Sequence, residues 1–191
     1  WVTLADAKTS TDIANITDDD TDESTQIMEH DNAANEALYY FSDDGDTDGS
    51  MKTGKNIKIE LDDDTFTFGF KTNGKAYDYR NDGLEDKKIY INGILQKAGT
   101  DEKYKLVDTS AAPADLKMKD AYLVGTSGTI VGTKKYVKDA DDNWWSVDTQ
   151  GAVENHGSDD YAKDLARCAS QNKTAVEKTN SDGEVTGYTC E

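Results

Sequence analysis

The chain has 191 residues and carries 39 Asp and Glu against 21 Lys and Arg, so its formal net charge at pH 7 is −18. This charge argues against nucleic acid as a partner, because phosphate binding needs a basic surface, and against docking on an anionic membrane. The sequence contains no run of 18 apolar residues, so no membrane insertion is expected. Asp outnumbers Glu 29 to 10. Asp favours turns and Glu favours helix interiors, so a mainly helical fold is not expected.

Material for a core is scarce, because Leu, Ile, Val and Phe make up only 31 residues. With this charge, such a composition borders on intrinsic disorder. Ten Tyr, three Trp and four Phe compensate, since each ring can bury on the order of 150–250 Å². Residues 5–37 contain no ring and are acidic. We predict a loop or partly disordered insertion there, with one helical turn around Ile27 and Met28.

From Tyr39 onward one pattern recurs: alternating aromatic or β-branched residues, a few polar residues, a Gly, and a short apolar stretch. The alternation predicts a strand, and the Gly supplies the positive φ of a hairpin turn. One hairpin alone is marginally stable, so serial copies predict a stack. We therefore expect a mainly β fold of stacked β-hairpin repeats, solenoid-like, over residues 38–153. The key glycines of the five copies are Gly49, Gly74, Gly93, Gly128 and Gly151.

The C-terminal residues 154–191 do not fit this repeat. The spacing of apolar residues over 161–168 predicts a helix, with Ser158 as its N-cap, and Asn180 to Gly183 predicts a hairpin turn. The only cysteines, Cys168 and Cys190, favour a local disulfide in an exported protein over two unrelated thiols. We expect a small helix-plus-hairpin cap at 154–191, after the repeat region at 38–153 and an N-terminal part at 1–37.

The repeat resembles the cell-wall-binding repeats of Gram-positive surface proteins, which include choline-binding and glucan-binding modules. The clearest match is Tyr39-Tyr40-Phe41, followed by Gly49-Ser50-Met51-Lys52-Thr53-Gly54. The segments 88–93 and 144–151 fit the same template, and residues 1–4 look like the end of a Gly-Trp unit in a longer protein. The resemblance implies an ammonium ligand held between aromatic rings of consecutive hairpins. Lys55 and Thr133 stand where the family has a cage Trp, which disfavours choline.

Candidate ligand residues are the rings of the repeat, and packing is the alternative role for each of them. Alternation along a strand puts Trp145 on the face of Val147 and Trp144 on the opposite face, so we expect Trp145 in the core and Trp144 in solvent. His156 is expected to be exposed and not catalytic. The candidate ligand residues are Trp144, Trp145, Tyr122, Tyr39 and Tyr40.

One acidic segment has the opening of a calcium loop, with Asp44, Asp46 and Asp48 before Gly49. The closing position holds Lys55 where a bidentate Glu is needed. Calcium is therefore not favoured, and no cofactor is expected.

These observations predict a non-enzymatic cell-surface module of a secreted bacterial protein, extracellular and associated with the cell wall. It would bind a wall polymer or glycan, or act as a structural spacer. The alternative is an accessory region of a wall-active enzyme whose catalytic domain lies outside this sequence.

Overall fold

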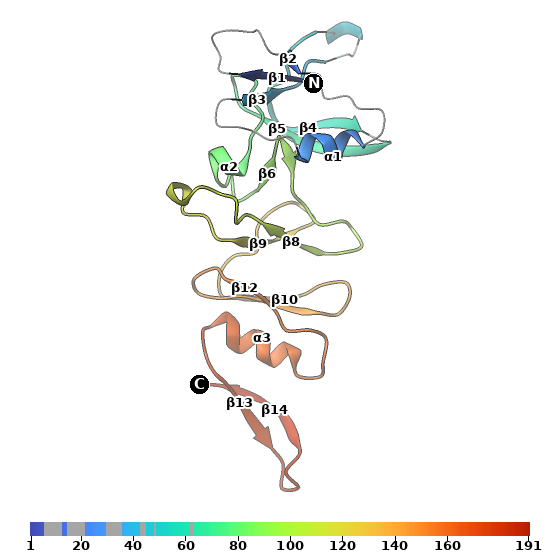
Figure 1. Cartoon of the computed structure of the whole chain (residues 1–191). Helices are drawn as coiled ribbons and strands as arrows, with labels where there is room; N and C mark the ends of the chain where they lie inside the picture. Colours follow the sequence, from blue (N-terminus) through green and yellow to red (C-terminus); the bar gives the residue numbers. More distant parts are fainter. Residues whose placement is uncertain (6–12, 15–21, 30–35, 43–44, 48, 62) are drawn as a thin grey trace. The chain divides into compact units, whose positions relative to one another are not determined.

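The computed structural model describes residues 1–5, 13–14, 22–29, 36–42, 45–47, 49–61 and 63–191. The fold is mainly β, with several small antiparallel sheets and hairpins and one short C-terminal helix (Figure 1). The chain forms two compact units, unit 1 at Trp1–Gln96 and unit 2 at Lys97–Glu191. The boundary between them falls inside the predicted repeat region, and the three-part division of the sequence stays a prediction. No continuous solenoid is detected among the described residues.

Unit 1 contains a three-stranded sheet of order β2-β1-β3 and a four-stranded sheet of order β4-β5-β7-β6. The helical turn predicted around Ile27 and Met28 is confirmed as α1. Asp63 has a positive φ of 65°, and Leu61 pairs with Asp64, so β4 and β5 form an antiparallel hairpin. The elements of unit 1 are β1 (Val2–Ala5), β2 (Ile13–Ala14), α1 (Glu23–Glu29), β3 (Glu36–Tyr39), the 3₁₀ turn η1 (Gly45–Thr47), β4 (Gly54–Leu61), β5 (Asp64–Phe70), α2 (Tyr79–Asp82), β6 (Tyr90–Ile91) and β7 (Ile94–Leu95).

The core of unit 1 is an apolar cluster that brings α1 and the strands together. Period-two alternation along β4 buries Ile59 and Leu61 and leaves Lys58 and Glu60 exposed. Phe68 is fully buried, and its ring centroid lies 5.0 Å from that of Trp1 and 5.8 Å from that of Phe70. The buried members of the cluster are Ile27, Leu38, Ile59, Leu61, Phe68, Phe70, Ala76 and Ile94.

A buried polar network fixes the turn between β6 and β7 in unit 1. The Asp78 carboxylate, 1% exposed, accepts hydrogen bonds from the Arg80 guanidinium and from the Asn92 backbone N–H at 2.7 Å. The Asn92 side chain in turn donates to the Ile27 carbonyl at 2.7 Å and so holds α1. Asn92 has a φ of 46° and Gly93 a φ of 89°, the conformation of a two-residue Asn-Gly hairpin turn. The hairpin predicted at Gly93 is confirmed.

Unit 2 is built from small hairpins and sheets with one helix. β8 pairs with β9, β10-β11-β12 form an antiparallel sheet, and β13 pairs with β14. Residues 109–120, which contain Pro113, connect β8 to β9 as an insertion. The elements are β8 (Tyr104–Asp108), the 3₁₀ turn η2 (Ala114–Leu116), β9 (Ala121–Gly125), β10 (Lys135–Lys138), β11 (Trp144–Val147), β12 (Val153–Asn155), α3 (Ala162–Ser170), β13 (Ala175–Thr179) and β14 (Val185–Cys190).

The same five-residue turn recurs in the described part of the chain. In each copy the backbone N–H of the first residue donates to the carbonyl of the fifth, at 2.7–3.1 Å, and the fourth residue has a positive φ. Three copies begin with Asp139, Asp148 or Asn180, whose side-chain oxygen accepts the N–H groups of the third and fifth residues. This side chain completes the turn's hydrogen bonding. The copies are 71–75, 125–129, 139–143, 148–152 and 180–184.

These turns confirm the hairpins predicted at Gly74, Gly128 and Gly151 and the turn at 180–183. The bridge between Phe41 and Met51 also closes a wider hairpin around Gly49. The turn at 139–143 was not predicted, because Asp142 takes the positive φ that a Gly supplies elsewhere.

The C-terminal helix, hairpin and disulfide are confirmed as α3, β13–β14 and a bond between Cys168 and Cys190. The N-cap predicted at Ser158 is wrong, because α3 begins at Ala162 and no side chain caps it. The chain before it is still part of the sheet edge, since Trp144 N–H donates to the Gly157 carbonyl at 2.7 Å. Residues 158–161 are needed to turn away from that edge before a helix can start.

Candidate functional site

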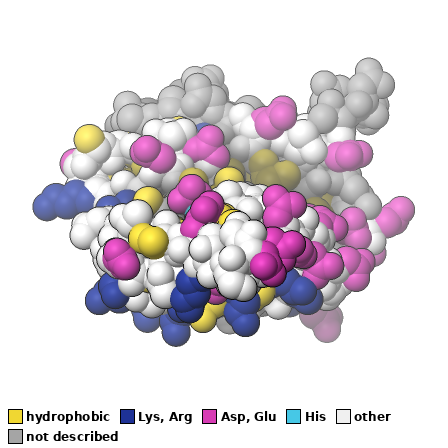
Figure 2. Space-filling view, turned by 90° about the horizontal axis from the view of Figure 1, so that it is seen from below, with side chains coloured by type: hydrophobic (Ala, Val, Ile, Leu, Met, Phe, Trp, Pro, Cys, Tyr) yellow, Lys and Arg dark blue, Asp and Glu magenta, His cyan; other side chains and the backbone are white. Residues whose placement is uncertain are grey.

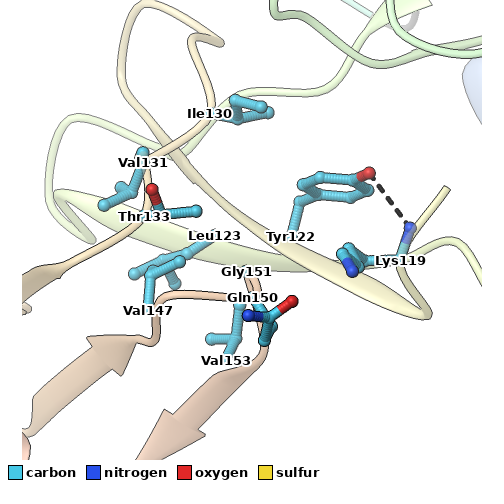
Figure 3. A pocket seen from close by; sticks show the side chains of 11 residues that line it. Lys119, Tyr122, Leu123, Ile130, Val131, Thr133, Val147, Gln150, Gly151 and Val153 are labelled. Carbon is cyan, nitrogen blue, oxygen red and sulfur yellow. Dashed lines mark hydrogen bonds between the residues drawn. The ribbon is translucent and has the colours of Figure 1, made fainter. Parts of the chain in front are cut away.

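The sheet β10-β11-β12 in unit 2 is covered on both faces, and this decides the environment of its two Trp residues. On one face α3 packs against it, and Lys163 Nζ of α3 lies 5.5 Å from the centre of the Trp144 ring. On the other face Val147 of β11 meets Leu123 of β9 (Figure 3). Figure 1 shows this sheet between the β8–β9 hairpin and α3.

The predicted division of Trp144 into solvent and Trp145 into the core is wrong, because both side chains are half-buried. Trp144 lies on the face that α3 covers and also contacts Tyr136, with ring centroids 6.0 Å apart. Trp145 shares its face with buried Val147, but its indole N–H donates to the Asp139 carboxylate at 2.8 Å in the turn. Each ring is therefore engaged within unit 2. Their role as ligand residues stays a prediction.

The prediction that His156 is exposed is also wrong. Its side chain is 8% exposed and its Nε2 lies 2.8 Å from the Ser146 hydroxyl, on the Trp144 face of the sheet. Burial lowers the pKa of His156 below its ordinary value of 6.5, against the opposing effect of Glu154, 3.8 Å away. Ser146 is only 1% exposed, so this pair offers no accessible nucleophile.

A hollow of about 160 Å³ lies on the opposite face, between the fourth and fifth copies of the predicted repeat (Figure 3). We call it the inter-repeat hollow. Tyr122, predicted as a ligand residue, lines it, and its hydroxyl oxygen accepts the Lys119 backbone N–H at 3.0 Å. The fourth copy contributes Tyr122, Leu123, Ile130, Val131 and Gly132, the fifth contributes Val147, Gln150, Gly151 and Val153, and Lys119 and Thr133 complete the lining.

The lining of the inter-repeat hollow differs in charge from the rest of the chain. None of its residues is Asp or Glu, although 39 of the 191 residues in the chain are acidic. Lys119 is the charged residue of the lining. Figure 2 shows both acidic and basic side chains on the face seen there and hydrophobic side chains only in small separate spots. The hollow therefore combines apolar surface with a locally positive rim.

The other two predicted ligand residues belong to unit 1. Tyr39 is buried in β3, and burial raises the pKa of its phenol. Tyr40 is half-buried, with its ring centroid 4.7 Å from that of Trp1. In these positions both rings contribute to packing.

Lys55, which stands where the resemblance to wall-binding repeats implies a Trp, lies near a ring of unit 1. Lys55 Nζ lies 5.6 Å from the centre of the Tyr77 ring and forms ion pairs with Glu85 and Asp86, the latter at 2.6 Å. Lys71 Nζ also approaches this ring, at 5.9 Å, and pairs with Asp82. Two ammonium groups of the chain thus lie near the Tyr77 ring.

The predicted calcium ligands can be followed only in part. Asp44 and Asp48 lie outside the described residues, and Asp46 is exposed in η1. The described residues contain no group of three or more His, Cys, Asp or Glu that could hold a metal ion. No helix in the described part of the chain is long and apolar enough to cross a membrane.

Comparisons with protein-family models, curated proteins and solved structures find no match to this chain.

The hollow includes residues that the sequence did not mark as a site. Ile130, Val131, Val147 and Val153 read as strand residues, and Lys119 lies in the insertion before the fourth copy. One signal was available, because Thr133 follows the fourth copy where the resemblance to wall-binding repeats implies a Trp. The sequence alone does not show that the two copies approach each other and enclose this space.

Proposed function

We propose that this chain is a non-enzymatic module of a secreted bacterial cell-surface protein, and that unit 2 binds a cell-wall polymer or glycan. The observation that carries the proposal is the inter-repeat hollow, an acid-free space between two consecutive repeat copies with Tyr122 in its lining. The resemblance to wall-binding repeats implies a ligand between consecutive hairpins, which is where this hollow lies. An acidic protein approaches an anionic or neutral polymer most easily through such a patch, since charge repulsion is weakest there.

Stacking of the hairpins as a degenerate repeat array is part of this proposal. The recurring turn supports it, because the same hydrogen-bonded turn joins strands at several points in unit 2. The contact of β12 with β9 supports it further, since these strands come from the fifth and fourth copies.

Choline is not the ligand we propose. Two aromatic pairs, Tyr77 with Tyr90 and Tyr136 with Trp144, already have lysines against one ring, Lys55 and Lys71 at Tyr77 and Lys163 at Trp144. A new cation would have to displace an ammonium that is already attracted to the ring.

The test is co-sedimentation with cell walls isolated from Gram-positive bacteria. Tyr122→Ala should reduce retention by about tenfold, which corresponds to a loss of about 1.4 kcal/mol of binding free energy. Tyr104→Ala is the matched control, because Tyr104 is a half-buried ring of the neighbouring strand β8 that does not line the hollow. Circular dichroism checks that both variants fold.

Two results would change the proposal. Equal loss of retention in both variants would show that the inter-repeat hollow is not the wall-binding site. Wild-type protein that ignores the wall altogether would leave the structural spacer as the function. The alternative is an accessory region of a wall-active enzyme. The gene around this segment distinguishes the two, because under the alternative it would also encode a catalytic domain.

A further inference from the structure

We infer that the inter-repeat hollow binds a small ligand group that combines a branched aliphatic part with a carboxylate. The inference deepens the proposed function and rests on it only in assuming that a wall polymer carries this group. It follows from the two chemically different ends of the hollow and from the charges around it.

The first end of the hollow is aliphatic. Leu123 and Val147 are almost fully buried there, and the half-buried side chains of Ile130, Val131 and Val153 extend the apolar wall. A water molecule needs two to four polar partners, which such a wall does not supply. The volume of about 160 Å³ lies below the ~300–1,000 Å³ of pockets for whole small molecules. The space therefore suits one branched aliphatic group.

The second end carries hydrogen-bond donors. Figure 3 shows the Tyr122 hydroxyl and Lys119 together on one side, and Val131 and Val147 on the other. The Tyr122 oxygen accepts the Lys119 backbone N–H at 3.0 Å, so its own hydrogen remains available for a ligand oxygen. The stem of Lys119 lies along the turn at Gly151, where a Cβ would come within 3.4 Å of Lys119 Cε. Lys119 therefore passes beside this turn with an exposed side chain, which leaves its ammonium at the rim.

The charge of this end selects an anion. The hollow is lined by one cation and no carboxylate. Some ammonium groups of the chain form ion pairs, as Lys71 does with Asp82 and Lys138 does with Asp142. Lys119 forms no ion pair in unit 2, which is described throughout. A carboxylate at the rim would receive charge-assisted hydrogen bonds, which a neutral amide of the same shape would not match.

The experiment titrates unlabelled 4-methylpentanoate into the methyl-labelled full chain and follows the Leu123 and Val147 methyl signals by NMR. Its neutral amide, 4-methylpentanamide, tests the charge, and acetate tests the aliphatic part. We expect these signals to shift with 4-methylpentanoate, and its binding to be about tenfold tighter than that of either comparison ligand.

Two lysine variants locate the charge. Lys119→Met keeps an apolar stem over Gly151 and should abolish the preference for the carboxylate over the amide. Lys105→Met makes the same change of net charge on β8, outside the lining, and should keep the preference. Absence of binding to the wild-type chain, equal binding of the amide, or equal loss in both variants would overturn the inference.

The wall experiment separates this inference from the proposed function. Wild-type protein that binds walls but not 4-methylpentanoate would leave the function standing and overturn the ligand class. Protein that binds 4-methylpentanoate but not walls would keep the ligand class and overturn the wall-binding function.

Discussion

Unit 1 and unit 2 reach a folded state by different use of their aromatic rings. All four Phe residues belong to unit 1, where Phe68, Phe70 and Tyr90 are almost fully buried. In unit 2 every ring belongs to Tyr or Trp and is half-buried, at positions 104, 122, 136, 144, 145, 161 and 188.

The polar atoms of the rings contribute to this difference, although unit 1 also buries Tyr39, Tyr79 and Tyr90. A Phe ring has no polar group and can be buried completely, whereas Tyr and Trp need a partner for a hydroxyl or an indole N–H. In unit 2 these partners are close to the surface, as with Trp145 and Asp139 or Tyr161 and the Val185 carbonyl. Unit 2 therefore depends more on its capped turns and its disulfide.

The largest effect should come from the buried rings of unit 1. Phe68→Ala removes a side chain with no solvent exposure that packs on Trp1 and Phe70. We expect a loss of about 3–5 kcal/mol in the unfolding free energy of unit 1. Hydrogen exchange followed by mass spectrometry would report it region by region. Phe41→Ala, at a ring that is 37% exposed, is the control and should cost far less.

Removal of the disulfide should weaken unit 2 by a similar but smaller amount. Cys168 and Cys190 are 22 residues apart, and closing such a loop contributes about 3 kcal/mol in the chain-entropy model. The double variant Cys168→Ser with Cys190→Ser should show this loss in urea unfolding curves followed by Trp fluorescence. Protection of unit 1 against hydrogen exchange should not change. A loss spread evenly over both units would contradict the comparison.

The capped turns provide a third, intermediate effect in unit 2. The Asp139 carboxylate is 9% exposed and accepts hydrogen bonds from Asp141, Asn143 and Trp145. Burial alone would raise the pKa of Asp139, but these hydrogen bonds outweigh that effect and lower it. Asp139→Ala should cost about 2 kcal/mol, because the donors lose a charged partner. Asp141→Ala, at an exposed position in the same turn, should stay within about 0.5 kcal/mol.

The smallest expected effect is the pH dependence due to His156. Because burial lowers its pKa in the folded chain below 6.5, the unfolded chain binds the proton more tightly. Stability from the neutral ring is fully present above about pH 6.5 and is lost as the pH falls through the folded pKa. Urea midpoints of the wild type should therefore fall more than those of His156→Gln between about pH 6.5 and 5. If the urea midpoints of the two proteins fell equally with pH, the pKa of His156 would be the same in the folded and the unfolded chain.

Much of the local structure could be predicted from the sequence. The turns at Gly74, Gly93, Gly128 and Gly151 follow from local backbone preferences, and so does the turn before Gly183. The pairing of Cys168 with Cys190 follows from there being two cysteines in one short tail. The turn at Asp142 was missed because a residue other than Gly took the positive φ.

The sequence by itself determined where strands alternate and where the chain reverses, because these features depend on residues within a few positions of one another. Only the tertiary structure decided which faces of a sheet are covered. The coverage of β11 by α3 on one side and by β9 on the other left Trp144 half-buried and enclosed His156. The inter-repeat hollow arises in the same way, since it exists only where two copies separated along the chain approach each other.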